Sequence, residues 1–239
     1  MTLEEQGNFL FKYRGQFPIL LFLSSIPFIK FTFFYNYNEI FIFSSIFFFT
    51  SGYLIRFYTI ATTPKNTSGR NTKKQIAETL NTKGIYSLVR NPLYLGNYLI
   101  WLGISLYTFN IYFLIYVSFI FYLFYSRIIF AEECFLRKKF DKQYNQWAQQ
   151  TNSFFPKSFS FTKSHIPFSF ISILRREYSS LLSGIVGYLF IDFVRNYLSY
   201  NSFFISDNLL KISSIVIFFI LILRTLKHHT TLLSENDRS

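Results

Sequence analysis

The chain has 239 residues, of which 51% are hydrophobic and 34 are Phe, and apolar runs of membrane length recur along it. About 20 apolar residues cross a bilayer as a helix, so these runs exclude a soluble globular domain and predict an all-α polytopic membrane bundle. The net charge of +12 lies in loops beside the runs, which is typical of the positive-inside rule rather than of nucleic-acid binding.

Six apolar runs are long enough to span a membrane. In chain order they are residues 17–35, 39–61, 92–109, 111–130, 178–200 and 209–226. Short joints at residues 36–38, at Asn110 and at residues 201–208 connect them in pairs as antiparallel hairpins. No cleavage signal precedes the first run, so we expect it to be retained as a span.

Single residues within the spans carry further predictions. Arg56 lies near the end of the second span, where its side chain can extend to the interface. Gly96 and Gly103 are one heptad apart in the third span, which allows a neighbouring helix to approach closely. Asp192 and Arg195 have helical spacing in the fifth span, and we expect them to pair with each other.

Two long polar segments, residues 62–90 and 131–177, lie between the hairpins. The second begins with an apolar stripe among charged residues, which predicts a cytoplasmic amphipathic helix ending before Pro156. Within it, Glu133 and Arg137 are four residues apart and can pair. The stripe consists of Leu136, Phe140, Tyr144 and Trp147.

Basic residues gather in the N-terminal stretch, the polar segments and the C-terminal tail, whereas the joints within the hairpins have almost none. The positive-inside rule therefore places both termini in the cytoplasm. We expect a core of four spans in residues 1–156 and an extension of two spans in residues 157–239. The single Cys134 excludes an intramolecular disulfide, and the three His lack zinc-like spacing, so we expect no metal.

Two polar clusters adjoin the second hairpin. Residues 84–96 read GIYSLVRNPLYLG, and residues 131–140 read AEECFLRKKF. Both are expected on the cytoplasmic side, and we predict that helix packing brings them together as one site.

The clusters carry groups that suit a charged ligand. Arg90 offers a planar fork for a carboxylate or phosphate, and Tyr86 and Tyr94 offer aromatic faces that stack on a base or shield a cation. Adjacent helical residues point about 100° apart, so one of Glu132 and Glu133 can face a ligand while the other faces a neighbouring helix. S-adenosylmethionine fits this set, because it carries an ammonium, a carboxylate, a purine and a sulfonium.

The first cluster resembles the glycine–tyrosine–Arg-His-Pro-x-Tyr signature of isoprenylcysteine carboxyl methyltransferases and membrane phospholipid methyltransferases. Residues 132–156, EECFLRKKFDKQYNQWAQQTNSFFP, resemble their second signature, a Glu-Glu pair followed by Leu, Phe-Gly, Tyr and a closing Pro. Both occur in the family's order, separated by one helical hairpin, and the resemblance covers residues 52–156. It implies an S-adenosylmethionine site at the cytoplasmic membrane face and a lipid acceptor that arrives laterally from the bilayer.

The resemblance also implies residue roles. Glu132 matches the glutamate that binds the cofactor's amino group, and catalytic roles are expected for Arg90, Glu133 and, inside the fourth span, Arg127. Further cofactor-binding positions are expected at Gln75, Glu78, Thr79, Leu80, Asn81, Tyr86, Asn91, Pro92, Leu93 and Tyr94.

Two residues depart from the signatures. Asn91 replaces the His, and Asp141 replaces the Gly after Phe140. Asn91 donates and accepts hydrogen bonds but cannot titrate near neutrality. Because an anionic phosphate or carboxylate needs no deprotonation, this replacement favours O-methylation of an anionic lipid group.

One branch of the family is closer in sequence. The stretches TSGRN, LNTKGIYSLVRNPLYLGN and LRREYSS resemble bacterial lipid A 1-phosphate methyltransferases, which implies an integral protein of a bacterial inner membrane. A basic set is available to receive such a phosphate. It comprises Arg70, Lys73, Lys74, Arg175 and Arg176.

Other functions stay open at this point. A sterol-type membrane reductase carries a similar Arg-His-Pro-x-Tyr turn and binds NADPH, although it commonly continues with Gly-Glu where this chain has Gly96-Asn97. Methylation of an isoprenylcysteine or of a phospholipid amine is a second alternative, and a non-enzymatic transporter or scaffold is a third. In the third case, Arg90 is a positive-inside anchor, and Glu132 and Glu133 are solvated residues of a first helical turn.

Overall fold

The computed structural model describes residues 1–32, 39–64, 67 and 75–235. Within these residues the chain forms seven α-helices, one short 3-10 turn, η1 (Ile85–Ser87), and no β-strand. The helices are α1 (Leu3–Tyr13), α2 (Phe17–Lys30), α3 (Glu39–Ala61), α4 (Pro92–Leu106), α5 (Ile111–Gln150), α6 (Phe170–Tyr200) and α7 (Asp207–His229). The predicted joint at residues 36–38 and the side chains of Arg70, Lys73 and Lys74 lie outside the described residues.

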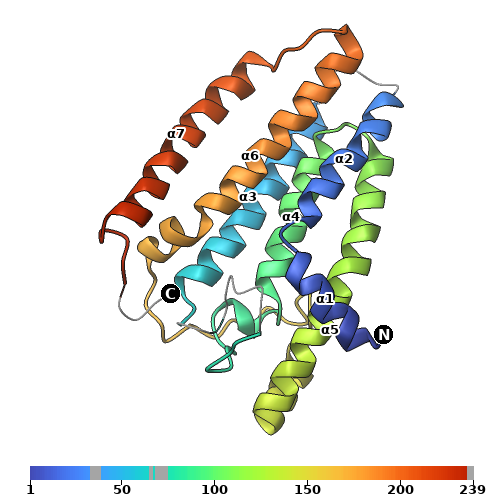
Figure 1. The fold of residues 1–239 in the computed structure, drawn as a ribbon. Coiled ribbons are helices and arrows are strands. Elements are labelled where there is room, and N and C mark those ends of the chain that lie inside the picture. The colour runs from blue at the N-terminus through green and yellow to red at the C-terminus, as the bar shows by residue number, and fades with distance from the viewer. Residues whose placement is uncertain (33–38, 65–66, 68–74, 236–239) are drawn as a thin grey trace.

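The all-α fold class is confirmed, and the predicted number of six spans is approximate. Helices α3, α5, α6 and α7 are long and apolar enough to cross a membrane. Helices α2 and α4 have only 14 and 15 residues, which corresponds to about 21–23 Å against a hydrocarbon thickness of about 30 Å. Side by side, α2 to α6 form a bundle, and α7 lies outside it against α6 (Figure 1).

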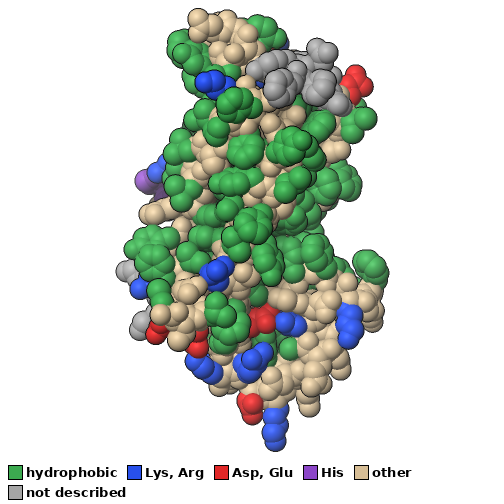
Figure 2. Space-filling view, turned by 90° about the vertical axis from the view of Figure 1, so that its right-hand side faces the viewer, with side chains coloured by type: hydrophobic (Ala, Val, Ile, Leu, Met, Phe, Trp, Pro, Cys, Tyr) green, Lys and Arg blue, Asp and Glu red, His purple; other side chains and the backbone are tan. Residues whose placement is uncertain are grey.

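Charged side chains gather at one end of this bundle. Hydrophobic side chains cover the middle of the face in Figure 2, and most Lys, Arg, Asp and Glu lie toward the end that carries α1. We call it the α1 end. The far half of α5 projects from the bundle at the same end (Figure 1).

Glycines set the packing of α3 against α4. A Cβ at Gly96 would lie 2.9 Å from the Gly52 carbonyl oxygen, and a Cβ at Gly103 would lie 2.7 Å from the Ser45 carbonyl oxygen. No side chain fits at those distances, so the predicted close approach at Gly96 and Gly103 is confirmed. The Ser45 hydroxyl also donates to the Gly103 carbonyl at 2.7 Å.

Among the described residues, two ion pairs lie inside the bundle. Arg195 and Asp192 pair as predicted, with Nη2 and Oδ1 2.6 Å apart. The prediction that Arg56 extends to the interface is wrong, because its Nε and Nη2 each donate to the Glu177 carboxylate at 2.7 Å. A carboxylate inside the bundle holds this arginine more favourably than a distant headgroup, because an unpaired buried charge is costly. The pair fastens α6 to α3.

The prediction of a single amphipathic helix at the start of the second polar segment is also wrong. Asp141 has φ 35° and ψ −106°, which is not helical, and it divides α5 into two arms. Glu133 and Ala148 lie on different arms, yet one guanidinium, that of Arg90, bonds to both. In a straight helix these residues would be about 22 Å apart, so the chain folds back at Asp141. The second arm ends at Gln150, before Pro156 as predicted.

The fifth span begins earlier than predicted. Helix α6 starts at Phe170, where the Ser169 side chain caps it by accepting from the Ser172 backbone N–H. It packs against α2, α3 and α4. The division into residues 1–156 and 157–239 stays a prediction.

Candidate functional site

The two polar clusters meet through an ion pair between Arg90 and Glu133. Arg90 donates from Nε to Oε1 of Glu133 at 3.1 Å and from Nη2 to Oε2 at 2.9 Å. Its Nη1 donates to the carbonyl oxygens of Ala148 and Thr151 at the end of α5. All three guanidinium nitrogens of Arg90 therefore hold the first cluster against both arms of α5.

Asn91 and the backbone extend this contact. The Asn91 side-chain amide donates to Oε1 of Glu133 at 3.1 Å and to Oγ of Ser153 at 3.0 Å. Backbone N–H groups of Arg90 and Asn91 donate to the carbonyls of Asn152 and Ser153 at 2.9 and 3.1 Å. The amide of Asn91 thus fastens the turn ahead of α4 to the segment that follows α5.

The turn itself follows from local sequence. Gly84 has φ 63°, a region that glycine adopts readily, and η1 follows directly. The Trp147 indole N–H donates to the Tyr86 carbonyl at 3.0 Å. Pro92 then begins α4 at its first position, where a missing N–H has no cost.

Both glutamates lie beyond the membrane-spanning part of α5. The first arm of α5, residues 111–140, is about 45 Å long, and its first 20 or so residues already cover the hydrocarbon thickness. Burial alone would raise the pKa of Glu133, but the hydrogen bonds and charge of Arg90 outweigh it and lower the pKa below its usual value. Glu133 pairs with Arg90 and not with Arg137, which lies over the Tyr144 ring instead.

Glu132 faces a different partner. Its Oε1 lies 3.8 Å from Nη1 of Arg14, a longer and looser contact than the Arg90 pair. Burial raises the pKa of Glu132 to about 7, although Arg14 and the Tyr94 hydroxyl lower it and Glu133 raises it further. The expected divergence of the two glutamates therefore holds, with Glu133 in the ion pair and Glu132 beside Arg14 and Tyr94.

Helix α1 covers this region, and the sequence reasoning missed it. A Cβ at Gly7 would lie 2.1 Å from the Arg127 carbonyl oxygen, so α1 lies directly on α5. The Nε of Arg127 donates to Gln6 at 3.0 Å, which places Arg127 in the α1 contact and not beside Arg90. Thr2 and Glu5 form a reciprocal capping box, and the pattern Thr-x-x-Glu before an apolar run is the signal that announces such a helix.

The upstream positions predicted to bind the cofactor make contacts away from the Arg90–Glu133 pair. Gln75 donates to Asn8 of α1 at 3.1 Å, whereas Asn81 donates to Thr67 at 3.0 Å. Glu78 and Thr79 are exposed, and Leu80 and Leu93 are partly buried. The contact of Gln75 joins this stretch to α1, and through α1 to the segment of Glu132.

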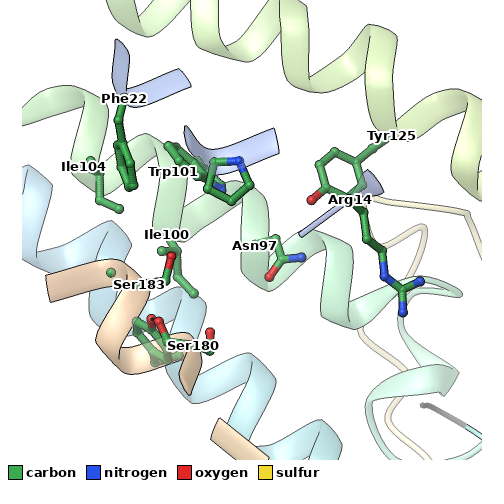
Figure 3. Close-up of a pocket in the computed structure, with 12 residues that line it drawn as sticks. Arg14, Phe22, Asn97, Ile100, Trp101, Ile104, Tyr125, Ser180 and Ser183 are labelled. Carbon is green, nitrogen blue, oxygen red and sulfur yellow. Dashed lines mark hydrogen bonds between the residues drawn. The ribbon is translucent and has the colours of Figure 1, made fainter. Parts of the chain in front are cut away.

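A cavity of about 120 Å³ lies next to Glu132's partner Arg14. Asn97 and Tyr125 lie beside Arg14 at one end, and Figure 3 shows the Arg14 guanidinium directed away from Trp101. Phe22 and Trp101 form the other end. Among the residues that the structure describes, no group of three His, Cys, Asp or Glu is placed to hold a metal ion.

Comparison with known proteins gives one match. Residues 40–143 match the family model of phospholipid methyltransferases. The matched part is less than half of the 239 residues. It contains α3, α4, Arg90 and both glutamates, and it excludes α1, α2, α6 and α7. No curated protein matches the chain, and no solved structure does.

Proposed function

We propose that the chain is an integral membrane methyltransferase that uses S-adenosylmethionine and methylates an anionic oxygen of a membrane lipid. The observation that carries this proposal is the ion pair of Arg90 and Glu133, which joins two motifs inside the matched region. That pair leaves Glu132 in a looser ion-pair contact with Arg14, and Arg14 lines a cavity.

The carboxylate and aromatic side chains of the candidate site suit this cofactor. Glu132 would bind the ammonium, and Tyr86 and Tyr94 would offer aromatic faces to the purine or the sulfonium. When bound, S-adenosylmethionine supplies a methyl group on a sulfonium that an anionic oxygen attacks directly: the O–C bond forms as the C–S bond breaks, and the electron pair stays on sulfur. Arg90 and Glu133 are positioning residues in this proposal, because their hydrogen bonds are already made within the protein.

The residues suit an acceptor that needs no base. The Asn91 amide is bonded to Glu133 and Ser153, so the position that holds His in the family offers no proton acceptor. An anionic oxygen loses its negative charge on methylation, and no proton has to leave. The protein then contributes mainly alignment, which can be worth about 7–11 kcal/mol.

Within this class we propose lipid A 1-phosphate as the acceptor and a bacterial inner membrane with cytoplasmic termini as the setting. Arg175 and Arg176 lie in the first turns of α6, and Arg176 is buried. Together with the basic segment around Arg70, they are candidates to receive the phosphate.

Labelling tests the proposal. Membranes that contain the full chain are incubated with methyl-labelled S-adenosylmethionine, and the extracted lipids are separated and identified. We expect one labelled anionic lipid with the wild type, none with Glu132→Gln, and full labelling with Glu39→Gln, an exposed glutamate at the start of α3. Undiminished labelling with Glu132→Gln would contradict the assignment.

A binding test separates methyl transfer from NADPH-dependent reduction. A ligand at 100 times its dissociation constant stabilises a fold by about 2.7 kcal/mol. S-adenosylhomocysteine should therefore raise the melting temperature of the purified chain, and NADPH should not. The opposite pattern would favour the reductase.

A further inference from the structure

Arg14 connects the cavity to the candidate cofactor-binding carboxylate. It lines the cavity, and its Nη1 lies 3.8 Å from Oε1 of Glu132. Its guanidinium carbon also lies 3.7 Å from the centroid of the Phe11 ring, so α1 carries the platform on which the arginine rests. The Arg14 cation thus lies between the cavity and the carboxylate of Glu132.

The cavity has the character of an amphiphile site. Arg14, Asn97 and Tyr125 give one end donors and a positive charge, whereas Phe22, Trp101 and Ile104 make the other end apolar. Ser180 and Ser183 of α6 complete the lining, and Ser183 is exposed on the flank of the bundle. An occupant with an anionic group and a hydrocarbon chain matches this order of polar and apolar walls.

The cavity lies between the matched region and segments outside it. Arg14 and Phe22 precede residue 40, and Ser180 and Ser183 follow residue 143, so segments outside the match to phospholipid methyltransferases form two of the walls. The candidate methyl-transfer motifs lie inside the match. Specificity for the acceptor is therefore expected to depend on Arg14, α2 and α6 as well as on the walls that α3, α4 and α5 supply.

Charge balance links the Glu132 carboxylate to the cavity. Glu132 carries at most one negative charge, and it forms an ion pair with Arg14. If an ammonium group of a ligand takes this carboxylate, the counter-charge of Glu132 is neutralised and Arg14 attracts an anion in the cavity more strongly. The side chain lines the cavity, and its guanidinium points away from Trp101 (Figure 3), so it has to rotate to reach an anionic occupant.

We infer that the cavity binds the acceptor as an anionic amphiphile, and that Arg14 receives its charged group once a cationic ligand has taken Glu132. This inference rests on the proposed function, which it deepens by naming an acceptor-binding residue. Binding free energies are reciprocal, so the cofactor and the acceptor should each raise the affinity for the other.

The test uses the purified full chain in neutral phosphatidylcholine nanodiscs, with S-adenosylhomocysteine and dodecyl phosphate as probes in calorimetry. Saturating S-adenosylhomocysteine should raise the wild-type affinity for dodecyl phosphate at least fivefold. Arg14→Gln should lower the dodecyl phosphate affinity at least tenfold, remove this coupling, and leave S-adenosylhomocysteine binding as tight as in the wild type or tighter. Lys12→Gln is the matched control, because Lys12 is an exposed cation of α1 and should behave as wild type.

Further probes identify the source of the anion and the position of the site. Dodecanol lacks the negative charge of dodecyl phosphate, and inorganic phosphate lacks its hydrocarbon chain. Both probes should bind far more weakly than dodecyl phosphate. Ser183→Trp fills the cavity and should abolish dodecyl phosphate binding while S-adenosylhomocysteine still binds, whereas Ser179→Trp on the exposed face of α6 should change neither.

Four outcomes overturn the inference. Equal dodecyl phosphate affinity in Arg14→Gln and wild type removes Arg14 from acceptor binding, and full binding in Ser183→Trp removes the cavity. Inorganic phosphate that binds as tightly as dodecyl phosphate identifies a free-anion site instead of an amphiphile site. If S-adenosylhomocysteine fails to bind the wild type, the proposed function itself fails and the inference with it.

Discussion

Substitution of Asp141 allows the backbone strain to be measured at the point where α5 reverses. Its φ of 35° and ψ of −106° lie where a side chain is unfavourable, at a cost of about 1–3 kcal/mol. Glycine removes most of that cost but loses about 0.5–1 kcal/mol through the freedom of the unfolded chain. The substitution Asp141→Gly should therefore stabilise the protein by about 1 kcal/mol.

The assay is thermal unfolding in nanodiscs, followed by fluorescence of the two Trp residues, one of which, Trp147, lies on the second arm of α5. A gain of 1 kcal/mol corresponds to an increase in Tm of about 2–4 °C for a chain of this size. Lys142→Gly is the matched control, because its helical position should lose about 1 kcal/mol on the same replacement. If Asp141→Gly melts at or below the temperature of Lys142→Gly, the strain argument is refuted.

Three other outcomes are expected. Arg90→Ala and Glu133→Ala should each strongly reduce methyl transfer while membrane insertion is retained. The double variant should be no worse than either single variant, since both side chains belong to one unit; additive losses would argue for separate roles. S-adenosylhomocysteine affinity should fall about tenfold from pH 8 to pH 6. Burial raises the pKa of Glu132, which lies beside Arg14, Tyr94 and Glu133, to about 7, and the carboxylate binds an ammonium only when it is ionised. A flat pH profile is expected only for Glu132→Gln, and in the wild type it would disprove this. Gly103→Leu should cost at least 1–3 kcal/mol through overpacking against α3, detected as a lower Tm.

The sequence predicts those parts of the molecule that depend on pattern. Apolar runs of membrane length give the helical class and the approximate order of spans. Asn110 marks the turn between α4 and α5, where its side chain accepts from the N–H groups of Tyr112 and Phe113. The meeting of Arg90 with the glutamate pair follows from two polar motifs that flank one hairpin, so the main contact of the candidate site was predictable.

The missed features depend on single backbone angles or on distant partners. An apolar stripe has the same spacing whether or not the helix folds back at Asp141, so periodicity does not reveal that turn. Helix α1 has 11 residues, too few for a strong periodic signal, and its position depends on the contact of Gly7 with α5. The cavity needs walls from both ends of the chain, and no local pattern reports which of them come together.

The pairing of Arg56 with Glu177 constrains the order in which the molecule is made. The two residues are 121 positions apart, so during synthesis the arginine enters the bilayer long before its carboxylate partner leaves the ribosome. Until then, a cation between α3 and α4 must be held by water, lipid phosphate or a chaperone of the insertion machinery. The bundle can thus reach its final packing only after α6 has been inserted, and a nascent chain that stops ahead of that helix should be a substrate for membrane quality control.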